Sequence, residues 1–497
     1  MSERAGGRAG ERVSDIDIGR ALARGSAWMV GLRWAMRGLG LASTFVLARL
    51  LSPGDFGVVA MAMLVVGLVE VFGHAGQTLA LIRLPNPTRA DHDAAWTLGI
   101  LIALAVALAT WAVAPVAAWY FHAPRVAWPI RLLALRPLLG GLDNIGVVAF
   151  RKEFRFSREA AFLASQKLAT VAVAIGVALW LRDERALVAG LLGGPAVGVA
   201  LSYALHPYRP RLSLARARGL LSFSGWMLLV HVAQYVHDKA DEMVVGGVAD
   251  AGAMGRYSVA ADTATAPTIE VVIPATRALF PIFARLGDDR AAVRDAYLQV
   301  FSAACPISVA TGAGMALVAG DFVRVALGEQ WIPAIPLVRL LALAGGLYGI
   351  AHNAITVLGA TGHARLSGLL SASRALVLVP VLVAAGLLGG VPAVAVARVL
   401  VTAAFIPGIF MVVVRVLSVA PADMVSRAWR PVVAGGAMAL AVPGVQAMAP
   451  DNPWPRLLLA ASAGALVYGG TMLALWRLAG RPDGLEAAVL RRARRRG

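Results

Sequence analysis

Apolar residues gather along this chain in long blocks that short polar stretches separate. The blocks reach about 20 residues, the length at which an α-helix crosses the hydrocarbon core of a bilayer. They do not alternate in polarity over about 10 residues, as the strands of a transmembrane barrel do. The pattern predicts an all-α polytopic membrane protein with fourteen spans, at residues 25–48, 57–81, 94–121, 126–150, 160–181, 186–205, 220–248, 257–283, 296–319, 334–360, 366–388, 393–416, 432–448 and 457–476.

The composition agrees with this class. Hydrophobic residues make up 59% of the 497 and charged residues 15%, whereas soluble domains have roughly 45–50% and about 25%. The single Cys305 excludes an internal disulfide framework. The first 24 residues are charged and rich in glycine, so we expect no signal peptide there.

The net charge of +18 follows the predicted loops. Alternate loops, beginning with the N-terminal tail, carry 29 of the lysines and arginines, and the opposite loops carry 7. Because basic residues stay on the cytoplasmic side, the distribution predicts that both termini are cytoplasmic. It also explains the charge without nucleic acid, which we do not expect as a partner. The cytoplasmic stretch "RKEFRFSRE" and the tail "RRARRRG" are expected to contact anionic membrane lipids.

Ten basic residues lie inside the predicted spans. Several are near span ends, where a long side chain snorkels to the interface. Four are too deep for this, and each costs about 2.5–3.5 kcal/mol on insertion scales. We expect those four, Arg37, Arg136, Lys167 and Arg277, to face a bundle interior or a wet cavity.

A weak internal repeat appears at an offset of 198 residues. Trp28 falls on Trp226, and Gly54 and Gly57 fall on Gly252 and Gly255. The offset covers six spans, so it predicts two parallel six-helix halves, an arrangement that suits an alternating-access transporter. The predicted organisation is a tail at 1–24, a lobe at 25–206, a cytoplasmic linker at 207–219, a second lobe at 220–417, two further spans at 431–476 and a basic tail at 477–497.

Four stretches carry a family resemblance. They are "RGSAWM", "LARLLSPGDFGVVAMA", "FSGWM…DKADEMVVGGVADAGAMGRYSVA" and "RVALGEQWIPAIPLVRLLALAG". In this order the chain resembles the polysaccharide-transport branch of the multidrug/oligosaccharidyl-lipid/polysaccharide flippase superfamily. The resemblance implies two lobes in a V with two appended helices. It also implies flipping of an undecaprenyl-diphosphate-linked oligosaccharide to the outer leaflet of the bacterial cytoplasmic membrane, for O-antigen, exopolysaccharide or teichuronic acid export, alongside a polysaccharide polymerase or assembly complex.

Such a cargo needs a desolvated cationic cradle, since the fork of an arginine fits phosphate oxygens. Arg33 and Arg37 are four residues apart, on one face of the first span. We therefore predict that they bind the diphosphate, with Arg136, Lys167 and Arg277 as further candidates. The alternative is that one of the arginines pairs with a carboxylate to hold helices together.

Carboxylates within spans are candidates for ion coupling. We predict this role for Glu70 or Asp238, with transport driven by a proton or sodium gradient, no cofactor and no metal site; structural pairing is the alternative. Arg136 and Asp143 are seven residues apart, a spacing that predicts an ion pair along one helix. Trp331, in "LGEQWIPAIP", is expected to anchor an outer loop at the membrane interface.

Other classes fit less well. ATP-driven transport within this chain is excluded, because none of its lysines follows a glycine as a Walker A loop requires. A membrane polymerase or glycosyltransferase usually needs a larger outer loop, so we expect no enzyme. A scaffold of an assembly complex leaves the buried charges unexplained. A small-molecule drug exporter of the same superfamily is the nearest alternative, although deep cations disfavour cationic drugs.

Overall fold

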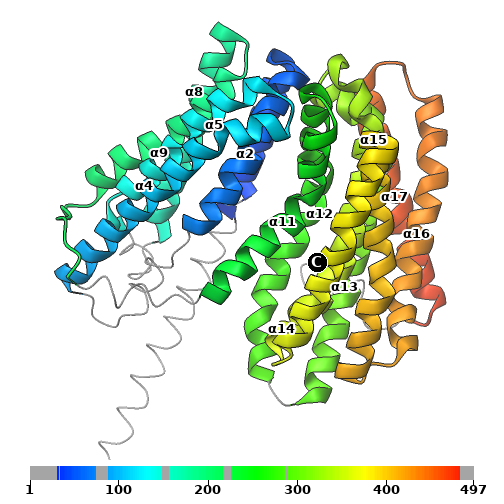
Figure 1. Ribbon diagram of the computed structural model, residues 1–497. Helices are drawn as coiled ribbons and strands as arrows, with labels where there is room; N and C mark the ends of the chain where they lie inside the picture. Colours follow the sequence, from blue (N-terminus) through cyan, green and yellow to red (C-terminus); the bar gives the residue numbers. More distant parts are fainter. Residues whose placement is uncertain are drawn as a thin grey trace, which may run out of the picture. The chain divides into compact units, whose positions relative to one another are not determined.

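The structure of the protein is a computed structural model that describes residues 31–32, 34–73, 88–147, 156–215, 225–286 and 289–481. Within these ranges all regular secondary structure is helical (Figure 1). Residues 34–50 form a first helix. The others are α2 (Pro53–Gly73), α4 (Arg89–Tyr120), η1 (Pro124–Val126), α5 (Ala127–Leu133), α6 (Leu135–Leu142), η2 (Ile145–Val147), α8 (Phe156–Leu181), α9 (Arg185–Leu205), α11 (Gly225–Val248), α12 (Ala251–Leu286), α13 (Arg290–Ala326), η3 (Glu329–Ala334), α14 (Ile335–Ala360), α15 (Ala364–Leu417), α16 (Pro421–Met448) and α17 (Pro453–Leu478).

Nine helical segments of the described chain are long and apolar enough to cross a membrane. The protein is therefore an all-α, multi-pass membrane protein, and the predicted fold class is confirmed. Helix is present in each of the fourteen predicted segments. That all fourteen cross the bilayer remains a prediction.

α15 is two spans rather than one. Its 54 residues would make a straight helix about 80 Å long, far more than the roughly 30 Å of a bilayer core. Gly390 breaks the helix with φ +65°, a left-handed conformation that glycine adopts without a Cβ penalty. Arg374 Nη2 then reaches Thr402 Oγ1 at 3.4 Å. In a straight helix these residues would stand about 42 Å apart, so the chain folds back at the predicted boundary between the two spans.

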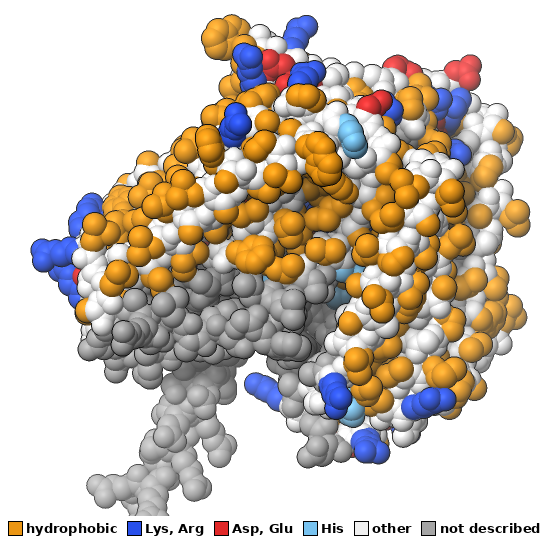
Figure 2. All heavy atoms as spheres, in the orientation of Figure 1, with side chains coloured by type: hydrophobic (Ala, Val, Ile, Leu, Met, Phe, Trp, Pro, Cys, Tyr) orange, Lys and Arg blue, Asp and Glu red, His pale blue; other side chains and the backbone are white. Residues whose placement is uncertain are grey.

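Large apolar side chains remain exposed along the helices. On the face shown in Figure 2, hydrophobic side chains cover the flanks of the helices, and charged ones gather near helix ends. Leu388, Leu440 and Leu466 are at least three-quarters exposed. Such exposure suits contact with lipid tails rather than water. Trp119 and Trp180, near the ends of α4 and α8, are also exposed, as expected for an aromatic belt at the membrane interface.

The fourth predicted span is broken. Its helix is interrupted at Ala134, between α5 and α6. Pro137 follows three residues later and has no N–H for a helical hydrogen bond. α6 ends at Leu142, and Asp143 has an extended backbone with ψ 140°. Arg136 pairs with Glu70 of α2 at 3.0 Å, and Asp143 Oδ1 makes no hydrogen bond within the described residues. The predicted ion pair between Arg136 and Asp143 is therefore wrong.

Contacts divide the chain into two compact units, residues 1–51 with 62–235 and residues 52–61 with 236–497. In the first unit, part of the predicted linker is bound to α4. Asp93 accepts hydrogen bonds from Tyr208 Oη at 2.6 Å and from the Arg211 N–H at 2.8 Å. Burial and the bond to Asp93 raise the pKa of Tyr208 above its ordinary value. Residues 206–215 are thus tied to the first unit.

In the second unit, the start of α2 packs closely on α12. A Cβ placed on Gly57 would lie 1.7 Å from the Ala251 carbonyl oxygen, and a Cβ on Gly255 would lie 1.8 Å from the Pro53 carbonyl oxygen. Pro53 and Ala251 are 198 residues apart, as are Gly57 and Gly255. The contact is therefore reciprocal between equivalent positions of the predicted repeat. Small residues allow backbones to approach this closely.

Trp331 lies in the same unit and is fully buried. Its ring meets Phe56 edge-on, with centroids 5.3 Å apart. The prediction of an interface anchor is wrong, because η3 places this indole among protein side chains. Two of the stretches that carry the family resemblance, "LSPGDFG" and "EQWIPAIP", therefore contact each other.

Candidate functional site

Two predicted cationic residues meet in the first unit. Arg37, on the helix at 34–50, is half-buried, as is Lys167 on α8. The Lys167 ammonium lies 3.3 Å from the position of a Cβ on Gly40, three residues beyond Arg37. The charges are close enough that Arg37 repels Lys167 electrostatically. In the described chain no carboxylate forms an ion pair with Lys167, so an anion at this place would relieve the repulsion.

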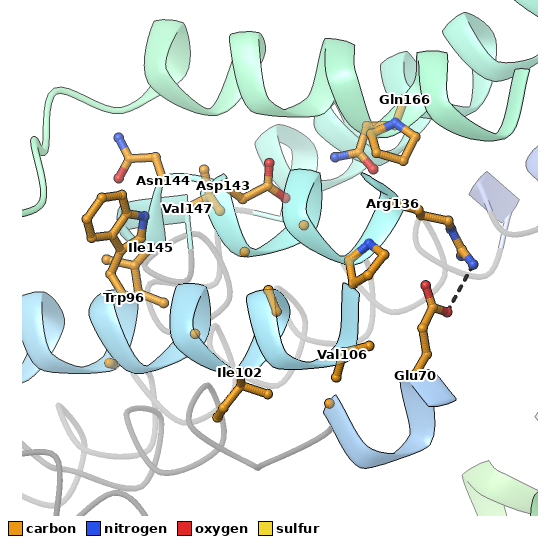
Figure 3. A pocket seen from close by; sticks show the side chains of 18 of the residues that line it. Glu70, Trp96, Ile102, Val106, Arg136, Asp143, Asn144, Ile145, Val147 and Gln166 are labelled. Atoms are coloured by element: carbon orange, nitrogen blue, oxygen red, sulfur yellow. Dashed lines mark hydrogen bonds and ion pairs between the residues drawn. The ribbon is translucent and has the colours of Figure 1, made fainter. Parts of the chain in front are cut away.

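Arg136 has a different environment. Its Nη1 lies 3.0 Å from Glu70 Oε2, and the two side chains are 33% and 21% exposed. A predicted cargo cation and a predicted coupling carboxylate thus neutralise each other. Figure 3 shows the pair at one side of a pocket.

This pocket has a volume of about 540 Å³ and lies within the first unit. Its walls come from the end of α2 and from α4, α6, η2, α8 and α9, and many are apolar or glycine. Asp143 lines it, and Asp143 Oδ1 is buried and makes no hydrogen bond with any residue that the structure describes. Gln166 and Trp96 are further polar lining side chains (Figure 3). A break in a span has therefore placed a carboxylate in a cavity.

Charged groups also meet in the second unit. Asp238 is exposed on α11, whereas Asp241, one turn later, is 5% exposed. Asp241 accepts a hydrogen bond of 2.9 Å from Tyr257 Oη, and Arg398 Nε lies 3.8 Å away. The buried carboxylates of α11 are thus Asp241 and its neighbour Glu242, which pairs with Lys239. The sequence analysis selected neither.

Arg374 is another residue that the sequence analysis missed. It is 4% exposed, donates to Thr402 Oγ1 and stacks over the Tyr348 ring at 5.5 Å. A cation over an aromatic face is stabilised by the ring quadrupole. The signal was available, since Arg374 lies well inside the predicted span 366–388.

Some predicted residues cannot be placed. Arg33 lies outside the described residues. Arg277 belongs to α12, but its side chain also lies outside the description. Their predicted roles stand as predictions.

Comparison with known sequences places the chain among proteins of polysaccharide biosynthesis. A sequence family described as "Polysaccharide biosynthesis protein" matches residues 46–336. The lipopolysaccharide biosynthesis protein WzxC of Escherichia coli (strain K12) is 23% identical over 366 residues, 73% of this chain and 74% of that protein. The succinoglycan biosynthesis transport protein ExoT of Rhizobium meliloti (strain 1021) is 29% identical over 355 residues, 69% of this chain and 70% of that protein.

Solved structures share the fold. A structure of the lipid II flippase MurJ in an inward closed conformation aligns with a TM-score of 0.74 at 13% identity, over 90% of this chain and 98% of that one. An inward-facing multidrug resistance transporter of the MATE family aligns with a TM-score of 0.59 at 14% identity, over 78% of this chain and 99% of that one. At these identities the likeness concerns the fold alone.

Proposed function

The chain belongs to the polysaccharide biosynthesis protein family, and on that premise we propose that it is a flippase. Its cargo is an undecaprenyl-diphosphate-linked oligosaccharide, which it carries from the inner to the outer leaflet of the bacterial cytoplasmic membrane by alternating access. The glycan then enters assembly of O-antigen or exopolysaccharide, alongside a polymerase. The protein itself catalyses no reaction, and both termini are cytoplasmic.

The proposal rests on Arg37 and Lys167. Both side chains come from helices of a membrane-embedded unit, and they lie close enough to repel each other. Like charges at this distance repel each other, and an anion that binds beside them lowers the free energy of the site. A diphosphate presents several oxygens to charge-assisted donors, which form strong hydrogen bonds in a poorly hydrated site. The pair therefore suits the linker between the lipid and the sugar.

The test is transport by the purified protein in proteoliposomes. A fluorescent undecaprenyl-diphosphate oligosaccharide is placed in both leaflets, and a reagent outside quenches only the outer pool. A flippase makes the inner pool accessible, whereas protein-free vesicles do not. A drug exporter would leave this lipid in place and instead move tetraphenylphosphonium, an apolar cation. That result would reject the proposal.

We also propose that a proton or sodium gradient drives the cycle and that Glu70 or Asp238 titrates in it. Glu70 already faces Arg136, so its protonation would release a cation in the first unit. Replacing Glu70 by Gln is expected to flatten the dependence of flipping on the proton gradient while the protein stays folded. Unchanged gradient dependence in both Glu70→Gln and Asp238→Asn would remove these residues from coupling.

A further inference from the structure

The pocket of the first unit carries hydrogen-bond acceptors rather than an excess of cations. Among its described lining residues, the only basic side chain is Arg136, which is paired with Glu70. Asp143 adds a carboxylate with an unpartnered oxygen. An ionised carboxylate only accepts hydrogen bonds. A diphosphate is also an acceptor and carries the same sign of charge, so it is unsuited to this cavity.

The other end of the cargo has the complementary chemistry. Sugars present many hydroxyl donors and an apolar C–H face. The pocket offers the Asp143 carboxylate, the amide of Gln166 and the indole of Trp96 within largely apolar walls. Its volume of about 540 Å³ lies in the range of sites that bind small organic molecules.

The pocket is also next to the cationic pair along the chain. Gln166 lines the pocket, and Lys167 is the following residue on α8. In the cargo, the first sugar is bonded directly to the diphosphate. A diphosphate beside Arg37 and Lys167 therefore leaves the glycan close to the same helix.

We propose that this pocket binds the glycan of the cargo, with Asp143 accepting hydrogen bonds from sugar hydroxyls. The inference rests on the proposed function. It assigns two parts of the cargo to two separate sites in the first unit. The cationic pair takes the diphosphate, and the acceptor-lined pocket takes the sugar. Binding of two lipids that differ only in the sugar therefore tests the two sites separately.

The experiment measures binding to the purified full-length protein in nanodiscs. The probes are undecaprenyl diphosphate, the same lipid carrying N-acetylglucosamine, and tetraphenylphosphonium. Replacing Asp143 by Ala is expected to weaken binding of the glycosylated lipid about tenfold or more, because a hydrogen bond to a charged group is lost. The affinity of Asp143→Ala for undecaprenyl diphosphate without a sugar is expected to stay within about twofold of that of the unmodified protein. Asp451→Asn, which removes a fully exposed carboxylate, serves as the charge-matched control and is expected to change neither.

A second variant does not depend on removing a buried charge. Gly140 lines the pocket, and a Cβ built there meets nothing within 4 Å. The leucine side chain of Gly140→Leu is therefore expected to occupy part of the cavity, and its Cβ meets no neighbouring atom. The variant is expected to weaken binding of the glycosylated lipid while binding of the bare lipid is kept.

Each contrary outcome has a distinct meaning. Equal losses for both lipids, or no loss in Asp143→Ala and Gly140→Leu, overturn the glycan pocket and leave the flippase intact. If Asp143→Ala loses binding of tetraphenylphosphonium but keeps binding of both lipids, Asp143 belongs to a cation site and the glycan pocket is rejected. If the unmodified protein binds neither lipid, the proposed function is wrong and the glycan pocket is rejected with it.

Discussion

The reciprocal glycine contact between α2 and α12 predicts a large and position-specific loss of stability. In Gly57→Ala, the new Cβ would lie 1.7 Å from the Ala251 carbonyl oxygen and 2.9 Å from the Gly255 nitrogen. Both are backbone atoms, so no flexible side chain can move aside. Overpacking costs about 1–3 kcal/mol in well-packed interiors and occasionally more. Because the backbones themselves must separate, we expect a cost of about 3 kcal/mol or more.

The assay is thermal unfolding of the purified protein in detergent, followed by the fluorescence of a thiol-reactive dye at the buried cysteine. At an unfolding entropy of about 2.1 cal/mol/K per residue, a loss of this size corresponds to a fall in apparent Tm of about 3 °C or more. Gly255→Ala is expected to behave alike, since its Cβ would lie 1.8 Å from the Pro53 carbonyl oxygen.

Gly54→Ala is the matched control on the same helix. Its Cβ meets only Ser52 Oγ, at 3.6 Å, which is an ordinary contact. Alanine in a helix is more stable than glycine by roughly 0.5–1 kcal/mol, so this variant should unfold at the same or a higher temperature. If Gly57→Ala and Gly54→Ala unfold together, the close contact does not stabilise the protein and the reasoning is refuted.

Three further predictions follow from described contacts. Glu70→Gln should lower the free energy of unfolding by about 1–2 kcal/mol, since a half-buried Arg136 loses its partner. Adding Arg136→Gln to this variant should restore part of the lost stability, and a further loss would contradict the pairing. Tyr208→Phe should cost about 1 kcal/mol, because one hydrogen bond to the start of α4 disappears; a stability equal to that of the unmodified protein would count against the bound linker. A cysteine in place of Asp451 should react with an impermeant maleimide in intact cells, whereas one in place of Arg365 should not, and labelling of Arg365→Cys would invert the predicted topology.

Hydropathy and charge predicted the broad architecture because a bilayer imposes long apolar helices. The boundary at Gly390 fell between two predicted spans for the same reason. The break at Ala134 was harder to foresee, although Pro137 gives a local cause. The partner of Arg136 was missed for a different reason, since Glu70 lies on another helix, α2.

The contents of the sites were less predictable, since they depend on which distant helices meet. Their position deep inside the predicted spans made Arg37, Arg136 and Lys167 look equivalent. The structure separates them, because Arg136 faces Glu70 while Lys167 lies beside Arg37. The unpartnered oxygen of Asp143 depends on where α6 ends, and Trp331 packs against Phe56, which is 275 residues away in the chain. Periodicity along one helix carries no information about such neighbours.

The central claim is that Arg37, with its neighbours, holds the diphosphate of the cargo. The most direct measurement is flipping of the fluorescent lipid-linked oligosaccharide per folded molecule, for Arg33, Arg37 and Lys167 each replaced by Ala and for Arg37→Lys. We predict severe loss in the alanine variants at normal abundance, because a charge-assisted bond in a poorly hydrated cleft disappears. Arg37→Lys should be partly active, since it keeps the charge and loses the fork. Normal abundance with normal flipping in all three alanine variants would contradict the claim.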